Sequence, residues 1–168
     1  NFWSSFIVVI LVLPIASLAG GYAPQETANR ASVEIALKAS LMSGEVPPGL
    51  EVTYDDTHGL WGGTAIIIHG SGRGERRERT RGDAEPKAFE TALQQKQLLE
   101  LIKLLIELKA WEQQTPDRPP VPDESRATLT ISVDGQRSSI WEWFNEMAKT
   151  KRLILIKAKM SKMTRSNQ

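Results

Sequence analysis

Residues 127–143 have the sequence Ala-Thr-Leu-Thr-Ile-Ser-Val-Asp-Gly-Gln-Arg-Ser-Ser-Ile-Trp-Glu-Trp, and this stretch decides the fold. In its first half, apolar residues alternate with threonine and serine, which is the period of a strand with one buried face. Asp134-Gly135 is a two-residue turn of the kind that joins antiparallel strands. We therefore predict a β-hairpin with strands over residues 127–133 and 136–143.

The region before this hairpin is rich in leucine, and it predicts a long helix over residues 86–113. Four leucines between Leu98 and Leu108 recur at spacings of three and four residues, the period of a helix with one apolar face. A second helix is predicted from Phe144 into the lysine-rich C-terminal part. The β-branched run at residues 153–156 leaves a final strand as the alternative there.

Three shorter segments before the long helix predict further strands. They are residues 50–54, the β-branched run 64–69 and the arginine- and glutamate-rich run 75–81, which follows a glycine-rich turn. A strand this highly charged suits a sheet edge or a solvent-facing sheet surface. The order ββ(β)-α-ββ-α predicts an α+β fold, in which a long helix and a C-terminal helix pack on one face of an antiparallel sheet.

We interpret residues 1–19 as a cleavable export signal. The uncharged run at residues 6–19 has the length of a signal-peptide core and is shorter than the roughly 20 residues that cross a bilayer. Ser17 and Ala19 place small residues three and one before the expected cleavage site at Gly20. The alternatives are a buried N-terminal helix and a retained membrane anchor. The expected location is secreted or periplasmic, with membrane association only if the leader is retained.

Behind the leader, the chain divides into three further parts. Residues 20–49 predict a linker, in which residues 29–42 either form a short helix docked on the domain or remain a partly ordered tether. The Pro-Pro-Gly sequence at 47–49 is a stop signal, so the α+β domain is expected to span residues 50–160. Residues 161–168 are expected to be frayed.

Composition excludes several classes of function. The 168-residue chain has a formal net charge of +1 and no cysteine. A dedicated nucleic-acid binder usually carries a strong basic excess, so no nucleic-acid partner is predicted. The lack of cysteine excludes disulfides, thiolate catalysis and cysteine-based zinc sites. No motif in the chain predicts a cofactor.

The order of the segments resembles a group of small bacterial exported domains of unknown function, and the layout is similar to that of emfourin, an inhibitor of thermolysin-like metalloproteases. The resemblance covers residues 50–158. It rests on the strand 50–54, the segment His-Gly-Leu-Trp-Gly-Gly at 58–63, the charged hairpin to Arg81, the helix to Trp111 and the hairpin at Asp134-Gly135. It implies an α+β fold and protease inhibition as one form of function. The turn Gly-Leu-Trp-Gly-Gly departs from the usual family pattern, so no inhibitory residue is carried over.

Two loops are the candidate partner-binding surfaces. One contains Trp61, Gly62 and Gly63, and the other is a proline-rich loop around Pro119 and Pro120. A tryptophan between glycines either caps the open end of the core or serves as an exposed anchor, because tryptophan is favoured at interface hot spots.

Two further tryptophans, Trp141 and Trp143, are two residues apart, so they share one face of their strand. We expect that face to be the core, within reach of Trp111.

A metal site is the alternative reading. Asp55, Asp56, His58 and His69 are side chains that zinc accepts. Their spacing matches no known zinc motif, and the intervening strand separates the two histidines by up to roughly 30 Å. Turn aspartates and partly exposed histidines are the ordinary reading. In the same way, the run Gly-Ser-Gly-Arg-Gly at 70–74 fits a hairpin turn better than a phosphate loop.

These observations predict an exported, non-catalytic binding domain with a protein partner. No catalytic residue and no metal ligand is assigned. The alternatives are a metal-dependent hydrolase around Asp55, His58 and His69, and a membrane-tethered structural protein of the cell envelope.

Overall fold

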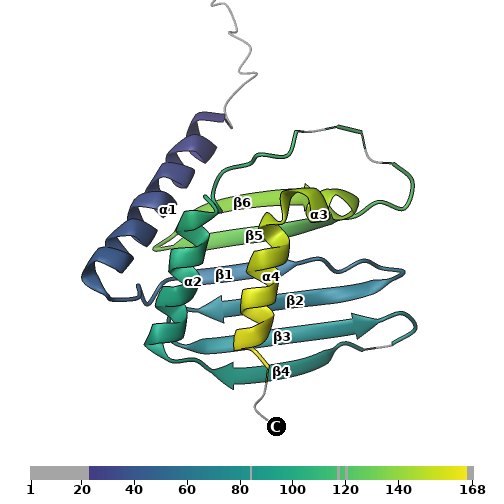
Figure 1. The fold of residues 1–168 in the computed structure, drawn as a ribbon, viewed down its shortest axis with the longest axis horizontal. Coiled ribbons are helices and arrows are strands. Elements are labelled where there is room, and N and C mark those ends of the chain that lie inside the picture. Colours follow the sequence, from purple (N-terminus) through teal and green to yellow (C-terminus); the bar gives the residue numbers. More distant parts are fainter. Residues whose placement is uncertain (1–22, 84, 117, 120, 166–168) are drawn as a thin grey trace, which may run out of the picture.

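The computed structural model describes residues 23–83, 85–116, 118–119 and 121–165. It shows an α+β fold built on one six-stranded antiparallel sheet with the order β4-β3-β2-β1-β5-β6 (Figure 1). The strands are β1 (Glu51–Asp55), β2 (Gly62–His69), β3 (Arg73–Thr80), β4 (Lys87–Ala92), β5 (Arg126–Val133) and β6 (Gln136–Trp143). The helices are α1 (Ala23–Ser43), α2 (Gln95–Glu107), α3 (Met147–Thr150) and α4 (Arg152–Met163), with a short 3-10 turn η1 (Phe144–Glu146) before α3.

The hairpin of β5 and β6 confirms the central prediction. The two strands pair from Arg126 opposite Trp143 to Val133 opposite Gln136. The turn residues Asp134 and Gly135 have φ angles of 49° and 82°. Positive φ at both central positions is the conformation that matches the twist of the flanking strands. The local chemistry of Asp-Gly therefore sets the register of this half of the sheet.

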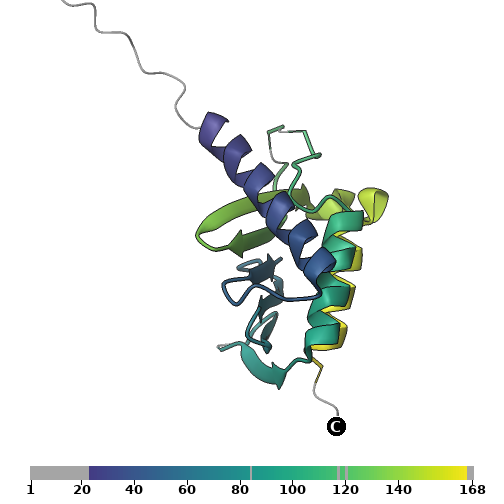
Figure 2. The same ribbon diagram turned by 90° about the vertical axis from the view of Figure 1, so that its left-hand side faces the viewer.

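Two helices cover only one face of the sheet. Figures 1 and 2 show α2 and α4 side by side on that face, whereas the described chain places no helix over the opposite one. The helix-covered face supplies the core, where the following strand residues have no exposed surface: Val52, Tyr54, Ile66, Ile68, Leu129, Ile131 and Ile140. The sequence prediction that the long and C-terminal helices share one face is confirmed.

The segment before α2 corrects one sequence prediction. A helix was expected from residue 86, but β4 occupies Lys87–Ala92 and pairs with β3 over six positions. Phe89 and Thr91 favour a strand, and pairing with β3 decides the outcome, because the leucine stripe begins only after it. As a result β4, and not the charged strand β3, forms this edge of the sheet. The arginines at 73, 77 and 79 in β3 are exposed, as expected, whereas the side chains of Glu75 and Arg76 are only 13% and 16% exposed. Glu75 pairs with Arg73, and Glu78 pairs with Arg76.

Of the two alternatives for residues 29–42, the docked helix is the one observed, so the region expected to be a linker packs on the domain. α1 spans 21 residues, and Val33 and Leu37 from it are fully buried in the main core. The helix packs mainly against β6 and α2, and Figure 2 shows it crossing beside them. The folded unit therefore begins well before residue 50. The side chain of Leu41, in contrast, is only partly covered, so the apolar stripe of this helix is short.

The predicted C-terminal helix is interrupted, and its main part begins at Arg152 rather than at Phe144. Lys151 has φ of 60° and breaks the helix between α3 and α4. In α4, Leu153, Ile156 and Met160 are buried, while Ile154 and Leu155 are exposed. Phe144, in η1 before the break, is exposed as well. The alternative final strand is therefore wrong. The expected fraying from residue 161 is also wrong up to Thr164, because Met163 and Thr164 are buried.

The prediction that Trp141 and Trp143 face the core is wrong. The two rings do share a face, with centroids 5.2 Å apart, but that face lies opposite the helices. Ser138, Ile140 and Glu142 face the core instead. The buried carboxylate of Glu142 is compensated by Arg152, whose Nε donates to it at 3.0 Å. This buried pair, formed by residues ten positions apart, is what allows a charged residue on the core side of β6.

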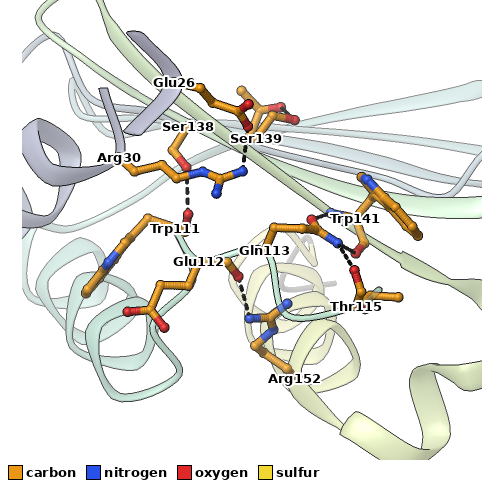
Figure 3. Close-up of polar contacts among 11 residues, drawn as sticks. Glu26, Arg30, Trp111, Glu112, Gln113, Thr115, Ser138, Ser139, Trp141 and Arg152 are labelled. Atoms are coloured by element: carbon orange, nitrogen blue, oxygen red, sulfur yellow. Dashed lines mark hydrogen bonds and ion pairs between the residues drawn. The ribbon is translucent and has the colours of Figure 1, made fainter. Parts of the chain in front are cut away.

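The segment that follows α2 is fixed to the sheet by side chains (Figure 3). Gln113 pairs with both backbone groups of Trp141: its Nε2 donates to the carbonyl at 3.0 Å, and its Oε1 accepts from the N–H at 2.9 Å. Ser138 donates to the carbonyl of Trp111, and Arg152 donates to the carbonyl of Glu112. These contacts set the start of the proline-rich loop, residues 115–124, which leads to the candidate site.

The residues of the predicted leader, 1–19, lie outside the described part of the chain. Within the described residues, no helix combines the length and the apolar character needed to cross a membrane.

Candidate functional site

A pocket of 340 Å³ lies at the end of the sheet where four separate segments meet. One wall is residues 58–63, the end of the β1–β2 connection and the start of β2, which we call the tryptophan loop. The other wall combines the end of the proline-rich loop with η1, and α4 contributes Lys157. The lining residues are Asp56, His58, Trp61, Gly62, Gly63, Asp123, Glu124, Ser125, Phe144, Asn145 and Lys157.

The backbone of the tryptophan loop is tightly constrained. His58 and Gly62 exchange two backbone hydrogen bonds, of 2.7 and 3.0 Å. Gly62 and Gly63 have φ angles of 82° and 144°. A Cβ on Gly62 would lie 2.0 Å from the carbonyl oxygen of Arg79, and one on Gly63 would lie 2.5 Å from that of Asp56. Both glycines line the pocket, but close backbone approach explains why they are glycines.

Trp61 projects from this loop with 56% of its surface exposed. It does not cap the core, which was one of the two readings of this residue. The guanidinium of Arg81 lies 4.5 Å from the centre of its ring. Across the pocket, Phe144 is 51% exposed. Two large aromatic side chains therefore stand at the rim of one hollow.

The opposite wall is held by an ion-pair network. Arg118 makes a two-pronged contact with Glu124, with both nitrogen–oxygen distances at 2.8 Å, and also donates to Glu146 at 3.0 Å. The Arg118 guanidinium holds the pKa of Glu124 below its usual range. Glu124, and to a lesser extent Glu146, raises the pKa of Arg118 above its usual range. Charge-assisted, two-pronged pairs of this kind fix geometry as well as energy.

Arg118 also belongs to a cluster of guanidinium groups and tryptophan rings. It lies 4.5 Å from the centre of the Trp143 ring, and Arg126 lies 4.3 Å from the same centre. Arg126 is also 3.8 Å from the centre of the Trp141 ring, and the two rings meet edge to face at 72°. We call Arg118, Trp143, Arg126 and Trp141 the arginine–tryptophan cluster. It fastens the proline-rich loop to the sheet.

A buried polar group forms the base of the pocket. Asp56 accepts from the Tyr54 hydroxyl at 2.7 Å, from the Thr64 N–H at 2.7 Å and from Lys157 Nζ at 2.5 Å. Burial, together with the charge of Asp56 and the hydrogen bond to it, raises the pKa of Tyr54. Tyr54 therefore stays protonated and acts as a donor. Asp56 is a compensated structural carboxylate.

The residues of the metal hypothesis are not brought together. The sheet register pairs Asp55 with Ala65, so His69 lies four residues further along β2, about 13 Å away at ~3.3 Å per residue. His69 contacts Glu51 and Glu75 at 3.5 and 3.3 Å, and Asp55 accepts from the backbone and hydroxyl of Thr57. In the part of the chain that the structure describes, no three His, Asp or Glu residues are grouped so as to hold a metal ion.

The pocket unites part of the two predicted loops. Trp61, Gly62 and Gly63 line it. Pro119 is exposed but does not line it, and Pro120 lies outside the described residues. Sequence reasoning missed Phe144 and Lys157, because both were placed on a single continuous helix. Only the break at Lys151 shows that they face the same hollow.

The chain matches no protein-family model and no curated protein. Its function must therefore be argued from the pocket.

Proposed function

We propose that this protein is a non-catalytic binding domain that holds a segment of a protein partner in the pocket between the tryptophan loop and the proline-rich loop. One observation carries the proposal: the rim of the pocket exposes two aromatic side chains, Trp61 and Phe144, each by more than half. Large exposed apolar side chains grouped at a hollow are typical of interaction sites. Tryptophan in particular often anchors a partner.

The buried polar groups at the base of the pocket support binding rather than catalysis. Tyr54 stays protonated, and Asp56 already accepts three hydrogen bonds. A general base must be able to take a proton from a bound substrate, whereas Asp56 is fully engaged within the protein. Inhibition of an exported metalloprotease is one specific form of the proposed binding, and it rests on the resemblance to emfourin alone.

A capture experiment tests the proposal. Immobilised wild-type protein and Trp61→Ala are exposed to the envelope and exported fractions of the source cells, and retained proteins are identified by mass spectrometry. We expect a partner that wild type retains and Trp61→Ala loses. Ile35→Ala is the control, because Ile35 is 69% exposed on α1 and is absent from the pocket lining. Identical partner sets for wild type and Trp61→Ala would overturn the proposal.

The proposal includes export from the cytoplasm, on the basis of the leader sequence. The mass of the protein recovered from cells tests this part. We expect a chain that begins at Gly20, whereas a mass that includes residues 1–19 would contradict cleavage and favour a retained anchor.

A further inference from the structure

We propose that the side chain that enters the pocket is basic, with arginine as the preferred residue of the partner segment. This inference rests on the binding function proposed above. Three features of the pocket carry it: its unpaired carboxylate, the incomplete stacking on Trp61 and its volume.

The charges of the pocket leave one acidic group without compensation. Asp56 is paired with Lys157, and Glu124 shares Arg118 with Glu146. One guanidinium thus serves two carboxylates on this wall. Asp123, which also lines the pocket, is exposed and forms no hydrogen bond or ion pair within the described residues. The wall formed by the proline-rich loop and η1 therefore has a surplus of negative charge that favours a cation.

Trp61 has one guanidinium neighbour among the described residues, whereas Trp143 has two. Trp143 has two guanidinium groups near its ring, those of Arg118 and Arg126. Trp61 carries only Arg81 among the described residues. A guanidinium is planar and stacks well on indole rings. An arginine from the partner would complete at Trp61 the arrangement that is already complete at Trp143, with Asp123 as its counter-ion.

The volume of the pocket fits a single long side chain. Pockets for small molecules range over roughly 300–1,000 Å³, so 340 Å³ is at the small end. Phe144 and Trp61 offer apolar surface to the methylene groups, and polar groups of Ser125 and Asn145 line the same hollow. An anionic side chain is disfavoured, because the lining cation Lys157 is already tied to Asp56.

A titration of the full chain tests this directly. The probes are N-acetyl-arginine amide and N-acetyl-citrulline amide, which has the same shape without the charge. Binding is followed through the NMR resonances of the Trp61 indole and the Asn145 backbone. We expect saturable shifts with arginine, with a Kd on the order of 1–10 mM for so small a ligand. Binding of citrulline should be about five-fold weaker or worse, and salt should weaken binding of arginine.

Two matched variants test whether Asp123 supplies the negative charge that binds the arginine probe. Asp123 and Asp134 both have left-handed backbones, with φ of 60° and 49°, a conformation that asparagine tolerates. Asp123→Asn should lower the affinity for the arginine probe to that for citrulline. Asp134→Asn, at the β5–β6 turn, should leave it unchanged. Unfolding curves of both variants establish that each is folded.

The outcomes separate this inference from the function on which it rests. Equal affinity for the two probes, no shift with either, or no effect of Asp123→Asn would overturn the assignment of a basic side chain. Because the titration uses no partner, such a result leaves the capture experiment intact. A partner that is captured independently of Trp61 would instead overturn the binding function itself.

Discussion

The molecule contains two tryptophan sites that bear arginine, and they differ in how completely the chain covers them. Trp143 is 2% exposed and contacts two guanidinium groups, those of Arg118 and Arg126. Trp61 is more than half exposed and meets only one, from Arg81. The first site joins the proline-rich loop to the sheet, whereas the second borders a pocket. The same pair of residue types is thus buried and joins two segments at Trp143, whereas at Trp61 it is left exposed at the rim of a pocket.

The largest expected difference between the two sites is in stability. Trp143→Ala should lower the free energy of unfolding by about 3–5 kcal/mol, because it removes a large buried ring and leaves a cavity. Trp61→Ala should lower it by less than about 1 kcal/mol, because its surroundings are largely solvent. Chemical denaturation of both variants measures this. Similar losses would mean that Trp61 is part of the core after all.

Substitution of Gly63 by alanine should lower the stability of the protein, whereas the same substitution at Gly59 should change it little. Gly63→Ala should cost about 1–3 kcal/mol, because the backbone is left-handed and the new Cβ would meet the Asp56 carbonyl. Gly59 is the control in the same loop, since a Cβ there meets nothing within 4 Å. Thermal unfolding of the two variants gives the comparison, and equal effects would contradict the close approach.

Lowering the pH should remove the stability that the ion pair between Glu124 and Arg118 contributes near Trp143. The folded-state pKa of Glu124 is lowered by Arg118, so its ion pair contributes stability above the pKa of an unfolded glutamate, near 4.3. That contribution is lost as the pH falls through the lower folded-state pKa. Unfolding midpoints measured from pH 7 to pH 3 should fall less steeply for Glu124→Gln than for wild type. Parallel curves would show that the pair contributes nothing.

The smallest expected effect is at the open site. Arg81→Ala removes a stacking partner worth about 0.5–1 kcal/mol at an exposed position. Stability should change by no more than that, while the indole resonance of Trp61 should move because a guanidinium no longer lies over its ring. A resonance that stays in place would show that Arg81 and Trp61 are not stacked in solution.

Local turn chemistry was the part of the fold that the sequence predicted well. Asp134-Gly135 fixes the β5–β6 hairpin through two positive φ angles, with no help from distant residues. The strand β4 was missed because its pairing with β3 is a contact between segments, and six residues give too short a pattern to outweigh the adjoining helix. Propensity is a weak guide when tertiary pairing decides the element.

The same reason explains the error at Trp141 and Trp143. By composition, the face with two tryptophans is more apolar than the face with Ser138, Ile140 and Glu142. The second face is nevertheless the core, because Arg152 compensates Glu142 from another element. In the site, Trp61 stood out from the sequence because it lies between glycines. The position of Phe144 at the pocket could not be predicted, because the chain breaks its helix at Lys151, where no proline or glycine indicates a break.

The side chain of Gln113 has a consequence for how this protein meets other copies of itself. By occupying the N–H and carbonyl of Trp141, it takes the place of a neighbouring strand at that point of β6. Unpaired strand edges are the templates from which chains aggregate. The sheet is thus sealed there against addition of a further strand, while the other edge, β4, carries Lys87 and Glu90 as charged deterrents. Gln113 thus occupies, at this position, the backbone groups through which another chain could pair with the sheet edge.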